Sequence, residues 1–139
     1  MCPRFEAARP AQPGASQTAG LSDWSLVSIA TGNAFDDGPA HRGWLVGNFI
    51  APPDSVANTS DVEIKWGTHA AGEERADWTT GETRTSMMLL ISGRFLQRLP
   101  DREVELSRQG DYVMWGPGVV HAWRAIEDSV MLTVRWPSV

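Results

Sequence analysis

The chain has 139 residues, of which 42% are hydrophobic and 21% charged, and its formal net charge is −5. These values are typical of one globular domain that can bury its own core. The acidic balance argues against nucleic acid and anionic membranes as partners, because both attract basic surfaces. No apolar run approaches the ~18 residues of a membrane-spanning helix, and the N-terminus lacks the apolar segment of a signal peptide. We therefore expect a cytoplasmic protein.

Two residue types are scarce, and each limits the chemistry. Cys2 is the only cysteine, which excludes an internal disulfide and a cysteine metal cluster. Lys65 is the only lysine, so it is the one candidate for Schiff-base chemistry. Residues 1–20 are rich in Ala, Pro, Gly and Gln without an apolar period, which predicts a disordered leader or an arm that orders on a partner. The remainder, 21–139, is then a single domain.

From Leu21 onward, short apolar or alternating runs are separated by Gly, Pro, Asn and Asp. None holds a helical period for three turns, and many short strands at regular spacing predict an all-β sandwich or barrel. The predicted strands are WSLVSIA (24–30), GWLVGNFIA (43–51), DVEIKW (61–66), TSMMLLIS (85–92), RFLQRL (94–99), REVEL (102–106), DYVMW (111–115), HAWRAI (121–126) and VMLTVRW (130–136).

Two joints between these strands have specific turn chemistry. Pro100 and Asp101 separate two alternating runs, which predicts a hairpin. Gly110 and Asp111 precede the next strand, where glycine suits a positive φ and aspartate can accept backbone N–H groups.

His121 is the strongest candidate for a chemical role among the three histidines. It follows the tight turn GPGVV, and Trp123 shares its face by the two-residue period of a strand. A histidine and a tryptophan facing into a small barrel would give a pocket with one titratable group, although a core histidine bonded to a carbonyl is the alternative. We expect His41 to lie at the surface or to serve packing only. His69 lies in the longest predicted loop, where a site role is possible.

Spacing around His121 resembles the second motif of the cupins. Gly110, Gly118 and His121 match that motif, whereas Gly116 occupies its Pro position and Ala125 its Asn position. The preceding hairpin is similar to the family's inter-motif segment, and its Gly93 matches the glycine that closes the first motif. The resemblance covers roughly residues 62–136. It implies a cupin-like double-stranded β-barrel, or jelly roll.

The first cupin motif is degenerate in this chain. In metal-binding cupins it supplies His-x-His and then Glu, but those positions fall near WTTG (78–81) and on Ser86. The resemblance therefore implies a barrel without its usual metal site. An alternative site remains open, in which His69, His121 and a loop carboxylate bind Fe, Mn, Ni or Zn. Glu82 is the best carboxylate because it stands nearest the start of a barrel strand; the others are Glu73, Glu74 and Asp77.

Aromatic and cationic residues near the predicted barrel mouth are candidates for ligand contacts. Trp78, Trp115 and Trp123 could stack on a flat or ring-shaped molecule. Arg75 and Arg84 flank one loop and could hold a carboxylate or phosphate. The strand residues Ser86 and Met88 complete the expected ligand-binding set.

Three functions follow from these patterns. The first is a small-molecule-binding cupin without a metal, an isomerase or lyase using His121 as acid or base, similar to metal-free sugar epimerases. The second is a metal-dependent oxygenase or isomerase using His69, His121 and Glu82. The third is a non-catalytic sensor or a structural dimer built by the Trp-rich strands. In each case we expect a homodimer, with HRGWLVGNFI (41–50) as an edge or exchanged strand.

Overall fold

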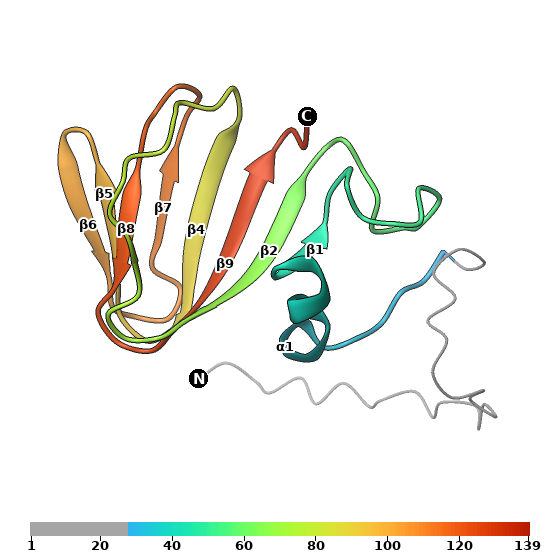
Figure 1. The fold of residues 1–139 in the computed structure, drawn as a ribbon, viewed down its shortest axis with the longest axis horizontal. Coiled ribbons are helices and arrows are strands. Elements are labelled where there is room, and N and C mark those ends of the chain that lie inside the picture. Colours follow the sequence, from blue (N-terminus) through green and yellow to red (C-terminus); the bar gives the residue numbers. More distant parts are fainter. Residues whose placement is uncertain (1–27) are drawn as a thin grey trace, which may run out of the picture.

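Two antiparallel sheets face each other in the computed structural model, which describes residues 28–139 (Figure 1). The predicted leader, residues 1–20, and most of the strand predicted at 24–30 lie outside the described residues. The larger sheet has the order β1 (Trp44–Val46), β2 (Glu63–His69), β9 (Ser129–Trp136), β4 (Thr85–Ser92) and β7 (Tyr112–Trp115). The smaller sheet has the order β3 (Glu74–Arg75), β8 (Ala122–Ala125), β5 (Phe95–Leu99) and β6 (Arg102–Leu106). The predicted all-β jelly roll is confirmed.

A buried apolar core joins the two sheets. Leu90 of β4, Phe95 of β5 and Met131 of β9 are fully buried. Burial alternates along β4, so Ser86, Met88 and Leu90 share its inner face. The same alternation decides which side chains of β4 point into the barrel.

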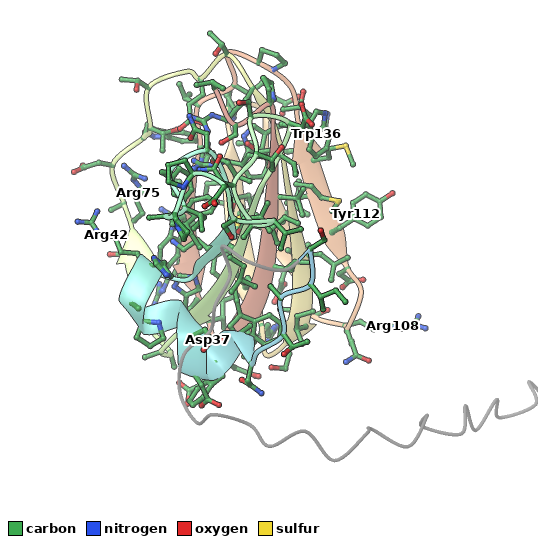
Figure 2. All side chains as sticks on the ribbon, turned by 90° about the vertical axis from the view of Figure 1, so that its right-hand side faces the viewer. Asp37, Arg42, Arg75, Arg108, Tyr112 and Trp136 are labelled. Atoms are coloured by element: carbon green, nitrogen blue, oxygen red, sulfur yellow. The ribbon has the colours of Figure 1, made fainter. Side chains whose placement is uncertain are left out.

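The outer face of the larger sheet is also apolar. Met87 lies opposite Met114, and Leu89 lies opposite Tyr112. Tyr112 and Met114 are 61% and 48% exposed, and Trp136 is 37% exposed. Figure 2 shows Tyr112 and Trp136 projecting from the same side of the molecule. Both faces of this sheet therefore carry apolar side chains, so hydrophobicity alone does not identify the inner one.

Short elements depart from the sequence prediction. The helical turns α1 (Ala34–Asp37) and η1 (Gly38–His41) occupy a segment expected to be a loop, and β3 lies within the longest predicted loop. Asn33 starts α1, since its side-chain oxygen accepts the N–H groups of Phe35 and Asp36 at 2.9 and 3.3 Å. Four residues are too few to show a helical period. No helix in the described part of the chain is long and apolar enough to cross a membrane.

Both turn predictions are confirmed. β5 and β6 form the expected hairpin, with Phe95 opposite Leu106. Gly110 has a φ of +92°, and Asp111 accepts the N–H groups of Ser107 and Arg108 at 3.0 and 2.9 Å. Glycine and aspartate here bring the chain into β7.

A buried carboxylate links β2, β9 and the segment before β4. Glu63 is 2% exposed and accepts hydrogen bonds from Arg84 at 2.6 Å, Arg135 at 2.7 Å and Ser138 at 3.2 Å. Glu82 lies 3.0 Å from Arg84 and 3.7 Å from Arg135. The two carboxylates and two guanidinium groups form one network, named here the Glu63 network.

We predict that Glu63→Gln lowers the free energy of unfolding by about 3 kcal/mol, because two half-buried guanidinium groups lose their shared partner. Urea denaturation at neutral pH measures this change. The matched control is Glu103→Gln, because Glu103 is exposed and pairs with Arg98 at 3.5 Å. The control should change stability by less than about 1 kcal/mol. Equal effects of the two substitutions would contradict a structural role for the Glu63 network.

Candidate functional site

A cavity of about 120 Å³ lies on the inner face of the larger sheet. Its volume equals that of about four water molecules in the liquid, so it suits a molecule of few heavy atoms. Among the residues predicted for the site, the cavity is lined by His69, Glu82, Ser86, Met88, Trp115, His121 and Trp123. Residues from four different strands and two loops therefore meet at one place.

Thr79 holds His121 at the cavity wall. The Thr79 hydroxyl accepts the backbone N–H of His121 at 3.1 Å and lies 3.1 Å from ring atom Nδ1. The Thr79 N–H in turn donates to the His121 carbonyl at 3.0 Å. Trp115 packs against the ring with the two ring centroids 4.6 Å apart. These contacts fix the orientation of a half-buried imidazole.

Burial lowers the pKa of His121 below its ordinary value of 6.5. The Val119 carbonyl and the charge of Glu82 oppose this shift, whereas the charges of Arg75 and Arg135 add to it. The ring is therefore neutral at pH 7 and can accept a proton.

His69 ends β2 and is oriented by a carboxylate. Its Nδ1 lies 3.0 Å from a Glu73 oxygen, and the other oxygen of Glu73 accepts the Ala70 N–H at 3.1 Å. The hydrogen bond from His69 lowers the pKa of Glu73. Trp123 packs on the His69 ring at a centroid distance of 4.5 Å. Gly67 leaves room for the ring, since a Cβ there would lie 3.0 Å from Nε2 of His69.

The predicted metal ligands share the cavity wall but do not form a metal site. Among residues 28–139, no three His, Cys, Asp or Glu side chains gather closely enough to hold an ion. Glu82 is paired with Arg84 and Arg135, which place positive charge where a cation would bind. His69, His121 and Glu82 therefore do not fit a divalent ion in this arrangement.

Ser86 and Met88 lie on the inner face of β4, and Trp115 lies on the inner face of β7. Ser86 is opposite Trp115 in the strand register and is 3% exposed. Trp123 of β8 closes the wall from the smaller sheet and stacks on Phe95 at a centroid distance of 5.3 Å. These residues give the cavity aromatic and apolar surfaces, and the hydroxyl residues in its lining are Ser86 and Thr133.

Three predicted ligand contacts lie apart from the cavity lining. Trp78 is 51% exposed. Arg75 belongs to the edge strand β3 and lies at the periphery of the molecule in Figure 2. Arg84 is bound by Glu63 and Glu82 within the Glu63 network.

Four residues that line or support the cavity were not among the predicted site residues, although Lys65 was a candidate for Schiff-base chemistry. Thr79 is the partner of His121, and Trp44, Lys65 and Arg135 contribute to the wall. The Arg135 guanidinium lies 4.3 Å from the Trp44 ring centroid, and the Lys65 amine lies 5.4 Å from it. The two-residue period from buried Met131 would have placed Arg135 on the inner face of β9.

No known family model matches the sequence, and no curated protein matches it. Solved structures do match the fold. KdgF from Halomonas sp. has a TM-score of 0.53 at 23% identity, over 59% of this chain and 75% of that chain. A cupin superfamily protein from Desulfitobacterium hafniense DCB-2 has a TM-score of 0.52 at 20% identity, over 58% and 71% of the two chains.

The DMSP lyase DddQ from Ruegeria pomeroyi DSS-3 has a TM-score of 0.51 at 16% identity, over 60% of this chain and 42% of that chain. Identities this low show the fold alone. The two-sheet topology and these similarities agree with the motif around Gly110, Gly118 and His121. The chain has the fold of the cupin superfamily.

Proposed function

We propose that the barrel cavity binds a small organic molecule and that His121 acts on it as general acid or base, as in a metal-independent isomerase or lyase. One observation carries this proposal: a neutral imidazole, held by Thr79, lines a cavity with tryptophan walls. Cavities with apolar walls and a few fixed polar groups are typical of ligand sites.

The proton transfer uses groups that line the same cavity. Because Nδ1 of His121 is engaged by Thr79, we assign Nε2 to the substrate. The neutral ring takes a proton from a C–H or O–H group, and Glu82 favours the resulting imidazolium. Returning the proton to another atom or face gives an isomer, whereas loss of a leaving group gives a lyase product. His69, oriented by Glu73, is a second acid–base group on the opposite sheet.

Three other functions have less support. A metal-dependent oxygenase or isomerase on His69, His121 and Glu82 requires a carboxylate that two arginines already bind. A non-catalytic sensor would use the same cavity without turnover. A structural homodimer is favoured by the apolar outer face at Tyr112 and Met114, or by β1 at the edge of the larger sheet.

We predict that a screen of small acids, sugars and aromatic compounds finds ligands that raise the melting temperature. A ligand at ~100 times its Kd adds ~2.7 kcal/mol to the free energy of unfolding. Ser86→Phe fills the cavity and should abolish the shift, whereas Arg108→Met on the exposed loop should keep it. A broad library without any hit would favour the structural dimer.

We predict that His121→Gln keeps ligand binding within about tenfold but lowers turnover of a substrate by about 10²- to 10⁴-fold. Calorimetry with a ligand from the screen measures the binding, and product formation measures turnover. Full turnover in the variant would exclude His121 as the acid–base group, whereas ligand binding without turnover in the wild type would favour the sensor.

We predict a pH effect on stability from the lowered pKa of His121. Below about pH 6.5 the unfolded chain takes up a proton that the folded chain resists, so the free energy of unfolding falls as the pH falls. His121→Gln lacks this loss. Urea denaturation between neutral and mildly acidic pH should therefore show the wild-type advantage over His121→Gln decreasing with falling pH. An advantage that is constant across this range would contradict the burial of a neutral ring.

We predict that protein purified without chelator retains far less than one Fe, Mn, Ni or Zn ion per chain, measured by elemental analysis. The reason is the pairing of Glu82 with Arg84 and Arg135. Near-stoichiometric metal that is lost in His121→Ala but kept in His41→Ala would support the metal-dependent alternative instead.

A further inference from the structure

Among the described residues that line the cavity, Glu82 and Arg135 are held in ion pairs, whereas Lys65 is not. Within the Glu63 network, Glu63 and Glu82 carry two negative charges, and Arg84 and Arg135 carry two positive charges. The four side chains form ion pairs with one another, with distances of 2.5 to 3.7 Å between arginine nitrogen and glutamate oxygen atoms. The network is therefore electrically neutral and offers no free charge to a bound molecule.

Lys65 is a cation of the cavity lining that has no ion-pair partner among the described residues. It lies on the inner face of β2 with Glu63 and Gly67 and lines the cavity. It takes part in none of the ion pairs formed among residues 28–139. Glu73 is the other carboxylate that affects Lys65, and it is bonded to His69.

The stem of Lys65 is held in place by packing. A Cβ on Gly43 would lie 3.3 Å from both Cγ and Cε of Lys65, so the glycine gives the stem its space. The amine lies 5.4 Å from the Trp44 ring centroid, a cation–π contact that leaves its hydrogen-bond donors free. Lys65 thus lines the cavity, and also a neighbouring one beside Gly43 and Glu73, with an ammonium group that has no ion pair among the described residues.

Burial lowers the pKa of Lys65, and the charge of Arg135 lowers it further, while Glu73 opposes the shift. The protonated amine is therefore under-compensated in its surroundings, and a negative charge beside it would stabilise it. The direction of this pKa shift agrees with the absence of an ion pair to Lys65 among the described residues.

We propose that the molecule bound in the barrel cavity is a small monocarboxylate, whose carboxylate pairs with the Lys65 ammonium group while its carbon end lies against Trp115 and Trp123. This inference rests on the proposed function, since it names the ligand class of the same cavity. Lys65 lines the cavity without an ion pair among residues 28–139, and one carboxylate would match its charge, whereas a phosphate dianion would bring a further negative charge into a half-buried site. The volume of about 120 Å³ suits a small acid.

The test compares acids with neutral amides of the same shape: acetate with acetamide, glycolate with glycolamide, and pyruvate with pyruvamide. Binding is followed by the tryptophan indole N–H signals in NMR spectra and by calorimetry, at fixed ionic strength. We expect the acids to bind more tightly than the amides. Lys65→Met should weaken acid binding about 10- to 100-fold and leave amide binding unchanged.

Two control variants separate the charge of Lys65 from general effects. Lys65→Arg keeps the charge and should retain acid binding within about tenfold, since the guanidinium differs in shape. Arg108→Met removes one positive charge from the exposed loop before β7 and should leave acid binding unchanged. Circular dichroism and melting curves establish that each variant is folded, and Lys65→Gln replaces Lys65→Met if the latter is not.

The outcomes distinguish this inference from the proposed function. Amides that bind as tightly as acids, in both wild type and Lys65→Met, would overturn the carboxylate assignment and leave cavity binding intact. Binding of phosphate or sulfate in place of the carboxylates would also overturn it. A screen in which neither acids, amides nor any other library compound binds would overturn both.

Discussion

The need to neutralise the buried carboxylate of Glu63 organises the mouth of this barrel. A charge that is 2% exposed is costly unless it is paired, and Arg84 and Arg135 provide the pairing from two other segments. This pairing also affects the site, because the same arginines bind Glu82. The carboxylate that was the best candidate for a metal ligand is therefore already paired with two cations. What remains available to a ligand is Lys65, the two histidines and the tryptophans.

Most of the strands could be predicted because their periodicity and turn residues agree. The bounds of β4 and β6 match the runs TSMMLLIS and REVEL, and the turn at Gly110–Asp111 forms as its residue types require. Short elements escaped prediction for a physical reason: α1 has four residues and β3 has two, so tertiary contacts decide their conformation. The strand predicted at 43–51 shrinks to β1.

Site residues that belong to a motif with fixed spacing could be predicted from the sequence. Site residues whose role depends on which way a side chain points could not. His121 follows from its place after the Gly118 turn. Alternation places Arg135 on the same face of β9 as Met131, but apolar residues on both faces of the strand leave open in the sequence which face is the inner one. Arg84 flanks a loop, as a residue that binds an anionic ligand would. Its hydrogen bond to Glu63, which lies 21 positions away, shows that it binds a carboxylate of the protein instead. Thr79 lies in the segment where metal-binding cupins have His-x-His, and a threonine there does not predict a metal ligand. Its hydroxyl group instead positions the ring of His121.

The hydrogen bonds between Thr79 and His121 have a consequence for how the imidazole is oriented. Residues 79–82 run beside 118–121, since the Gly118 N–H also donates to the Glu82 carbonyl at 2.7 Å. The hydroxyl of Thr79 and the carbonyl of Glu82 therefore fix the turn and the ring from a segment 42 positions away in the sequence. A substitution in residues 79–82 can thus misorient the imidazole without changing any residue of the motif that carries His121.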